Sequence, residues 1–338
     1  MSLQRCKTKH GQHITLTRSS SYFNETSKLD EKRLIFSFIF AVYLIVTHST
    51  PAIAGGKSQQ FTILNIDTIF EFYKPQPPLA KFVDNFWLYE GNDPQNTTER
   101  ILPTGTLELV INLRKNELRF YDAERSENSS RYSGAVVSGA HGRGLMPETP
   151  EEVCIIGVHF KPGGAFPFLG LPASDLADTH VDLETIWGLR ADRLRERLCE
   201  ARTSAERFQL LNEALMSRLC YGVEQHYAVS AALQMFWKNQ AGPTVREAAK
   251  YLGLSQRRFI QVFKSEVGMT PKLFSRIQRF QQTRTVIQQN ASPNWATLAL
   301  DLGYFDQSHL IREFLEFSGL SPTDYLKRRK RFIEHYTH

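Results

Sequence analysis

Cysteine is scarce in this sequence. Four cysteines occur in 338 residues, and no two of them form a Cys-x-x-Cys pair; they are Cys6, Cys154, Cys199 and Cys220. This scatter excludes a disulfide framework and the usual zinc sites, and it is typical of proteins from a reducing cytoplasm. We therefore expect a cytoplasmic protein without a structural metal.

Motifs of catalysis and phosphate binding are also missing. The chain has no Gly-x-Ser-x-Gly elbow, no His-Glu-x-x-His pair and no glycine-rich phosphate loop. Glu108, His141 and His159 could be imagined as metal ligands on a small β-barrel. His159, however, lies in an apolar stretch, where a hydrogen-bonded core histidine is the commoner arrangement. We expect no enzyme and no cofactor.

Long apolar runs are rare, and one lies near the start of the chain. Residues 34–46 read LIFSFIFAVYLIV, after Lys32-Arg33 and before Ala52-Ile-Ala54, which is the order of a signal peptide. The uncharged stretch 34–56 is just long enough to cross a membrane. Residues 1–60 therefore have three interpretations: a non-native extension from a misassigned start codon, a membrane anchor, or a secretion signal.

Residues 61 to about 220 have the pattern of an α+β domain. The composition of the chain, 41% hydrophobic and 22% charged, is that of a globular protein with two or three domains. Leucines and Phe208 at helical spacing indicate two amphipathic helices near the end of this region. Before them come short β-type runs, at residues 107–113, 118–121, 135–138 and 153–160, with turn residues between them. Strands first and helices after predict an α+β fold.

The last hundred residues contain one pattern twice. Six positions recur in the same order, offset by 50 residues before a turn and by 51 after it. They are Ala249, Gly253, Phe263, Gly268, Pro271 and Phe274 in the first copy, and Ala299, Gly303, Phe314, Gly319, Pro322 and Tyr325 in the second. Such self-similarity marks a duplicated supersecondary unit.

Each copy has the features of a helix-turn-helix. A small Ala lies where two helices cross closely, and the Gly four residues later permits the sharp turn. Ser255 and Asp306 are the expected N-caps of the second helices, and Gly268 and Gly319 are their expected C-caps. The prolines of the pattern suit the first turn of the helix that follows.

Positive charge is concentrated in the same region. Residues 241–338 contain fifteen Lys and Arg and eight Asp and Glu, a net charge of +7. The whole chain nets +6, so the residues before this region net −1. A basic surplus on the helix-turn-helix region suits a module that binds phosphates, which makes double-stranded DNA the expected partner.

On these residues, the segment 244–330 resembles the DNA-binding domain of the AraC/XylS family of bacterial transcription regulators. The most specific stretch is 299–314, ALDLGYFDQSHLIREF, and residues 319–322 and Tyr325 extend the match. Trp295 and Thr283 depart from the family, which usually has a smaller aliphatic residue and alanine there. Both differences affect packing more than DNA contact.

The resemblance implies an all-α domain with two helix-turn-helix units, at about residues 244–267 and 294–318, joined by a connecting helix. Val229, Leu233, Phe236 and Trp237 are at helical spacing. We assign the helix that they predict to this domain, which then covers residues 221–338.

The resemblance also implies which side chains reach the DNA. The second helix of each unit should enter a major groove by its N-terminal half, and the two grooves should lie roughly 34 Å apart. The expected DNA-binding residues are Arg257, Arg258, Ile260, Gln261, Gln307, Ser308, His309 and Arg312. Arg257 and Gln261 are the first choices, because Arg pairs bidentately with guanine and Gln with adenine. His309 is either a phosphate contact or a helix-packing residue.

Further basic residues lie on the connecting helix and near the end of the domain. Lys272, Arg276 and Lys327 are the expected phosphate contacts. Arg279 matches the arginine that is usual in the family at this position, and we expect it to form a structural salt bridge. Arg284 follows on the same helix.

The α+β region resembles the sensor-side domain that precedes the DNA-binding part in one AraC-type subgroup. The match rests on residues 101–105 with Glu108, residues 138–141, residues 157–164 and residues 169–172. It implies a domain for regulation or oligomerisation.

The sequence thus predicts a cytoplasmic, sequence-specific transcription regulator whose N-terminal domain binds an effector or dimerises. The expected partners are operator DNA, a small-molecule effector, a second copy of the chain and, for an activator, RNA polymerase. The alternative is a membrane-anchored or exported protein whose basic helical domain binds something other than specific DNA.

Overall fold

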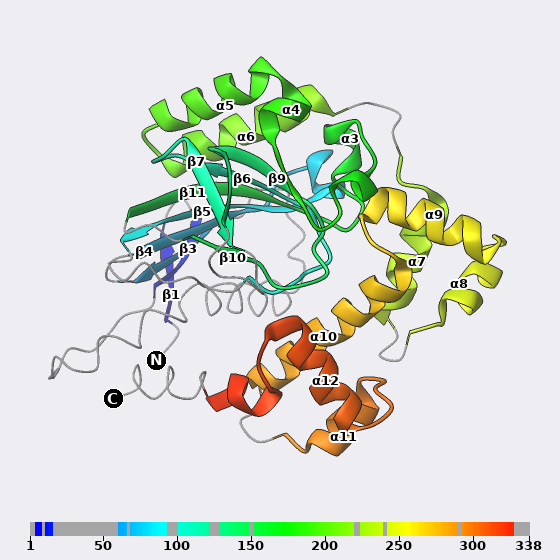
Figure 1. The fold of residues 1–338 in the computed structure, drawn as a ribbon. Coiled ribbons are helices and arrows are strands. Elements are labelled where there is room, and N and C mark those ends of the chain that lie inside the picture. The colour runs from blue at the N-terminus through cyan, green and yellow to red at the C-terminus, as the bar shows by residue number, and fades with distance from the viewer. Residues whose placement is uncertain are drawn as a thin grey trace, which may run out of the picture.

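The structure is a computed structural model of the chain. It describes residues 4–8, 11–15, 60–65, 68–92, 101–121, 129–148, 152–219, 224–238, 242–289 and 293–327. A β-rich domain with its own helices comes first, and an all-helical region follows at the C-terminal end (Figure 1). The prediction of an α+β domain followed by an all-α domain is confirmed.

A seven-stranded antiparallel sheet is the centre of the N-terminal domain. Its strand order is β12-β9-β6-β11-β5-β4-β3. The strands are β3 (Gln60–Asn65), β4 (Thr68–Tyr73), β5 (Val83–Asn92), β6 (Glu108–Asn112), β9 (Ala135–Ser138), β11 (Glu152–Phe160) and β12 (His180–Asp182). In the middle of the sheet, β11 pairs with β5 on one side, Ile156 opposite Leu88, and with β6 on the other, Ile156 opposite Ile111.

Two smaller sheets accompany it. The first has the order β10-β7-β8, and the second is a hairpin of β1 and β2. Their bounds are β7 (Glu117–Tyr121), β8 (Ser129–Ser133), β10 (Met146–Pro147), β1 (Gln4–Thr8) and β2 (Gly11–Thr15).

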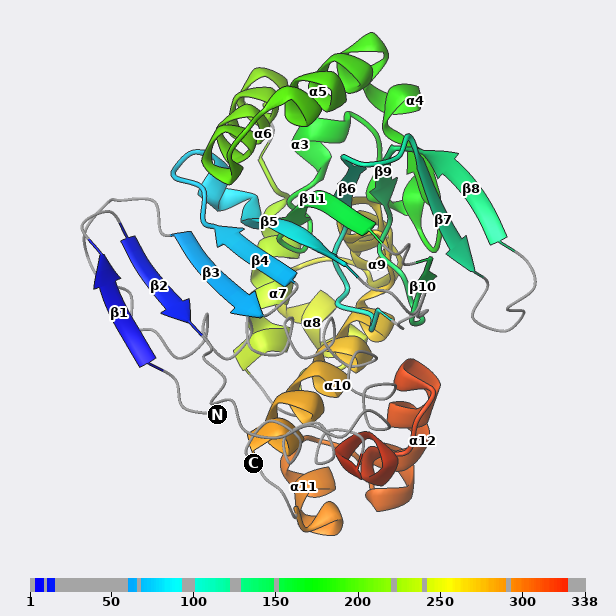
Figure 2. The ribbon, with the colours of Figure 1, turned by 90° about the vertical axis from the view of Figure 1, so that its left-hand side faces the viewer.

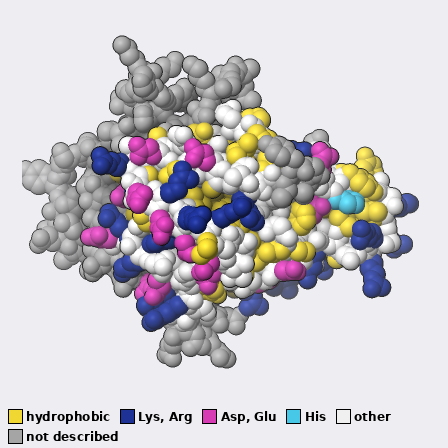
Figure 3. Space-filling model, turned by 90° about the horizontal axis from the view of Figure 1, so that it is seen from above, with side chains coloured by type: hydrophobic (Ala, Val, Ile, Leu, Met, Phe, Trp, Pro, Cys, Tyr) yellow, Lys and Arg dark blue, Asp and Glu magenta, His cyan; other side chains and the backbone are white. Residues whose placement is uncertain are grey.

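Helices cover one face of the large sheet (Figure 1). They are α4 (Leu183–Trp187), α5 (Leu189–Glu200) and α6 (Ser204–Arg218). The other helices of this domain are η3 (Leu79–Lys81), α3 (Phe166–Leu169) and η4 (Ala173–Leu176). Phe208 of α6 stacks on Tyr73 and Phe86 of the sheet, with ring centroids 5.6 and 6.5 Å apart. Seen from above, basic and acidic side chains are interspersed over this layer (Figure 3), so the face carries no block of one charge.

Local pattern predicted the four β-type runs that form β6, β7, β9 and β11 within one residue at each end, and it predicted two helices where α5 and α6 lie. It missed β8, β12 and the short helices α3 and α4. β8 reads Ser-Ser-Arg-Tyr-Ser and lacks apolar alternation. Only its pairing with β7 makes it a strand.

The C-terminal region is built around one long helix. The helices are α7 (Tyr227–Lys238), α8 (Val245–Tyr251), α9 (Gln256–Val267), α10 (Pro271–Gln289), α11 (Trp295–Asp301) and α12 (Gln307–Ser318). α10 has α7, α8 and α9 at one end and α11 and α12 at the other (Figure 2). The two helix-turn-helix units and their connecting helix are therefore present as predicted.

Residues 34–54, on which the signal or anchor interpretation rests, lie outside the described residues. Within the described part of the chain, no helix combines the length and the apolar character needed to span a bilayer.

Candidate nucleic-acid interface

α9 buries one face and exposes the other. Its N-cap is Ser255, whose hydroxyl accepts a hydrogen bond from the Arg258 backbone N–H at 3.2 Å, and it ends at Gly268 with φ of 89°. Ser255 and Gly268 were the predicted caps. Phe259 and Phe263 on the inner face are fully buried, so the polar residues between them face outward.

The outward residues of α9 include most of those predicted to read bases. Arg257, Arg258 and Gln261 are exposed, and Ile260 is half-buried. Arg258 donates from Nη1 to Gln261 Oε1 at 3.1 Å, which orients the glutamine amide. Arg257 forms no hydrogen bond or ion pair with another described residue, so its guanidinium is available for an acceptor outside the protein.

α12 repeats this arrangement in the second unit. Asp306 caps it by accepting from the His309 backbone N–H at 2.7 Å, and Gly319 ends it with φ of 73°. Gln307, Ser308 and Arg312 are exposed. They occupy the N-terminal half of the helix, as the predicted role requires.

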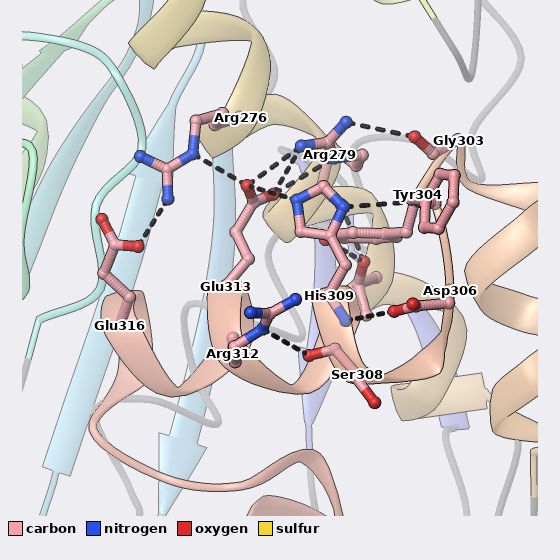
Figure 4. Close-up of polar contacts among 12 residues, drawn as sticks. Arg276, Arg279, Gly303, Tyr304, Asp306, Ser308, His309, Arg312, Glu313 and Glu316 are labelled. Atoms are coloured by element: carbon pink, nitrogen blue, oxygen red, sulfur yellow. Dashed lines mark hydrogen bonds and ion pairs between the residues drawn. The ribbon is translucent and has the colours of Figure 1, made fainter.

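A buried carboxylate fixes α12 to α10. Glu313 is 2% exposed and accepts from Arg276 Nε at 2.8 Å and from Arg279 Nη2 at 2.9 Å (Figure 4). Arg279 also donates to the Gly303 carbonyl at 3.2 Å and lies over the Tyr304 ring. The structural salt bridge predicted for Arg279 is confirmed, and Glu313 is its partner.

The His309 ring points toward Glu313 and Tyr304 of its own domain (Figure 4). Its Nδ1 accepts from the Phe305 backbone N–H at 3.3 Å, and its ring meets Tyr304 edge to face. Its Nε2 lies 3.8 Å from the Glu313 carboxylate. Both ring nitrogens thus face groups of the domain, which favours the packing role over the phosphate contact.

The predicted phosphate contacts differ in their surroundings. Lys272 is exposed at the start of α10. Lys327 is exposed and lies 3.7 Å from Asp324. Arg276 is held by Glu313 and, at 2.5 Å, by Glu316, so its charge is already matched within the domain.

One feature of the second unit was not among the predicted contacts. Phe305 is 85% exposed directly before the cap of α12. The second copy has one residue more between its turn glycine and its cap than the first, and this is the reason that the repeat offset changes from 50 to 51. The change of offset was the sequence signal for an inserted, solvent-facing aromatic residue.

The three residues considered as metal ligands do not cluster around one point. His159 Nδ1 lies 2.8 Å from Glu108 Oε1, and its Nε2 lies 3.3 Å from the Thr106 hydroxyl. The hydrogen-bonded core histidine is therefore confirmed. His141 instead packs against His180, at 4.8 Å between ring centroids. Among the described residues, no group of His, Cys, Asp or Glu has the arrangement of a metal site.

These buried histidines predict a stability that depends on pH. Burial lowers the pKa of His141 to about 4 and of His180 to about 3, from 6.5. The unfolded chain therefore binds protons below pH 6.5 that the folded chain does not. Each imidazole should lower the free energy of unfolding by roughly 2 kcal/mol between pH 7 and pH 5.

The variant His180→Phe isolates this effect, because it keeps a ring stacked on Phe120, which lies 3.7 Å away. Urea denaturation at pH 7 and pH 5 should show a drop that is smaller in the variant by about 2 kcal/mol. Equal drops in the two proteins would show that His180 titrates normally in the fold.

α9 and α12 are both capped, both expose a polar face, and are joined by α10. This arrangement defines a double helix-turn-helix domain, the fold that places helices in DNA major grooves. Family models agree with this fold. Residues 248–328 match a helix-turn-helix domain, and residues 71–182 match a domain of unknown function, DUF6597.

One relative matches about a quarter of the chain. An uncharacterized HTH-type transcriptional regulator of Haemophilus influenzae is 29% identical over 83 residues, which are 25% of this chain and 28% of that protein. The chain thus spans little more than a quarter of that relative.

Two solved structures are similar as well. The C-terminal domain of AraT, a response regulator from Geobacillus stearothermophilus, is 24% identical and covers 34% of this chain and 95% of its own, with a TM-score of 0.31. ToxT from Vibrio cholerae is 10% identical and covers 72% of this chain and 97% of its own, with a TM-score of 0.40. The chain carries a helix-turn-helix domain at residues 248–328, behind an N-terminal domain that matches a separate family model.

Proposed function

We propose that this protein is a sequence-specific transcription regulator that reads two successive major-groove segments with α9 and α12. The observation that carries the proposal is the matched exposure of the two helices. Each is capped by a side chain at its N-terminus, buries its aromatic face and leaves polar side chains free on its first two turns. That is the part of a recognition helix that meets base edges.

The side chains have distinct proposed roles. Arg257 and Gln261 read bases from α9, with Arg258 and Ile260 beside them. Gln307, Ser308 and Arg312 read from α12. Arg312 donates from Nε to the Ser308 carbonyl at 3.3 Å, which holds its guanidinium along the outer face of the helix. Such bidentate donors and amides are the usual partners of guanine and adenine.

The N-terminal domain is proposed to regulate DNA binding. It touches the DNA-binding domain directly, because Gln278 of α10 donates to the Thr104 carbonyl at 3.1 Å and Gln281 donates to the Pro103 carbonyl at 2.6 Å. A small molecule or a second copy of the chain that changes this domain would therefore act on α10.

The test is DNA binding by the full chain to the region upstream of its own gene, titrated against salt and against a scrambled competitor. We expect a preference of about a hundredfold or more for the cognate site. Binding that depends steeply on salt but shows no preference would identify a non-specific DNA-binding protein instead.

Lys272 supplies a second, independent prediction. It is exposed at the N-terminal end of α10, where a phosphate of the bound duplex would lie. Lys272→Ala should reduce the slope of log K against log salt by about one unit and leave the sequence preference unchanged. Lys115→Ala, in an exposed hairpin of the N-terminal domain, is the matched control. An equal change in both variants would remove Lys272 from the interface.

A further inference from the structure

A cavity lies on the face of the large sheet that α5 and α6 leave uncovered. Its volume is about 140 Å³, and its lining is mostly apolar. Phe70, Trp87 and Tyr89 of the sheet and Phe120 of β7 contribute aromatic rings. A dry cavity of about 150 Å³ holds one benzene ring. This cavity therefore has room for one ring or a short acyl chain.

The floor of the cavity is flat because a glycine lies under the tryptophan. A β-carbon at Gly157 would come within 2.3 Å of the Trp87 indole, so only glycine lets the indole rest against β11. Phe70 stacks on the same indole, with the ring planes 7° apart and the centroids 6.3 Å apart. The missing side chain at Gly157 of β11 thus makes room for the aromatic surface of Trp87 and Phe70.

Both acidic side chains of the lining already have cationic or hydrogen-bonding partners. Glu108 lies 2.8 Å from the His159 ring, and Glu148 lies 3.4 Å from Arg119. The hydrogen bond and charge of Glu108 outweigh burial and raise the pKa of His159, which keeps this pair matched. Neither carboxylate is left to balance a further positive charge.

Arg284 of α10 also lines the cavity, and it is 2% exposed. It donates from Nε to the Tyr325 hydroxyl at 3.2 Å and from Nη1 to Gln281 Oε1 at 2.8 Å, and both partners are neutral. No carboxylate of the described residues lies within ion-pair distance of it. A buried cation without a counter-charge is costly, so an anion in the cavity would be stabilised strongly.

His141 gives the cavity one more polar atom. Its Nε2 is buried and has no hydrogen-bond partner among the described residues. Burial lowers the pKa of His141 to about 4, so the ring is neutral at pH 7. A neutral ring nitrogen can form a single directed hydrogen bond to a ligand without adding charge.

We propose that this cavity is the effector site and that its ligand is a small apolar carboxylic acid, bound as the anion. The carboxylate pairs with Arg284, and the apolar body lies on the aromatic floor. The proposal rests on the function proposed above. A sugar would need many more polar partners than this mostly apolar lining offers.

The position of Arg284 links the ligand to DNA binding. Through Gln281 it is connected to the Pro103 carbonyl of the N-terminal domain, at 2.6 Å from the glutamine amide. Through the Tyr325 hydroxyl it is connected to α12, because the Tyr325 ring packs against Phe314 with centroids 5.4 Å apart. A carboxylate that draws the guanidinium into the cavity alters both contacts, so the ligand and α12 are coupled.

The test uses isothermal titration calorimetry on the full chain with three probes. They are 3-phenylpropanoate, its neutral amide, and octanoate. We expect the acid to bind about tenfold or more tightly than the amide, because only the anion matches Arg284. The comparison with octanoate decides between a ring and an acyl chain. Equal binding of acid and amide would overturn the anion, and no binding of any probe at millimolar concentration would overturn the site.

Two variants locate the probe. Arg284→Met should remove the preference for the acid and leave binding of the amide unchanged. Val110→Trp, which fills the cavity from β6 without touching the charge, should abolish binding of all probes. If Arg284→Met does not fold, Val110→Trp still tests the location of the site, and the acid-to-amide comparison still tests whether the ligand binds as an anion. Unchanged binding in Val110→Trp would place the probe elsewhere.

DNA affinity measured on the same samples separates this proposal from the function on which it rests. The acid should change the affinity for the cognate site by about fivefold or more, and this change should vanish in Val110→Trp. Specific DNA binding that no probe alters would overturn the effector site alone. Probe binding in a protein without any sequence preference for DNA would overturn the regulator function alone.

Discussion

Glu313→Gln should lower the free energy of unfolding of the DNA-binding domain by about 3 kcal/mol, because it leaves the Arg279 guanidinium without its counter-charge and leaves Arg276 with only the exposed Glu316. Glu313 is 2% exposed, while the side chains of Arg276 and Arg279 are 28% and 17% exposed. The three charges form one unit between α10 and α12. Removing the charge of Glu313 leaves Arg276 and Arg279 to repel each other, with only Glu316 beside Arg276.

Urea denaturation followed by circular dichroism measures this loss. Glu316→Gln is the matched control, because Glu316 contacts the same Arg276 but its side chain is 50% exposed. The control should cost less than about 1 kcal/mol, as solvent-exposed ion pairs do. If both variants lost the same small amount, Glu313 would not be the charge that fixes α12.

This network shows where prediction from sequence ended. The caps and the turn glycines could be predicted because each depends on a residue within a few positions of the turn. Arg279 could be assigned a salt bridge, but its partner lies 34 positions away on another helix. Nothing in the local spacing of Glu313 distinguishes it from an exposed glutamate of the same helix, such as Glu316.

The cavity lies beyond sequence analysis for a similar reason. The sequence predicted the apolar β-type run that forms β6, but not that α10 would meet the sheet there and line a cavity with it. Arg284 in particular was grouped with the arginines of the connecting helix. Its burial depends on where the two domains meet, and that contact has no periodic signature.

The recognition helices allow a test of base reading that separates it from charge alone. Arg257→Ala should weaken binding to the cognate site by about 1–3 kcal/mol and relax the preference at one base pair. Arg246→Ala is the control, because Arg246 is equally charged and exposed but lies on α8. That variant should weaken binding to all sequences alike, if at all. A uniform loss in Arg257→Ala would instead make Arg257 a phosphate contact.

Arg312→Ala tests base reading by α12 of the second helix-turn-helix unit. Because α9 and α12 lie toward opposite ends of α10 (Figure 2) and share no hydrogen bond, ion pair or ring contact among the described residues, their contributions should be additive. The double variant Arg257→Ala/Arg312→Ala should then lose about 2–6 kcal/mol and relax two base pairs about one helical turn apart. A double loss equal to that of one single variant, with no loss in the other single variant, would mean that only one of the two helices enters a groove. In that case α10 would position a single recognition helix, and the other helix-turn-helix unit would not contact bases.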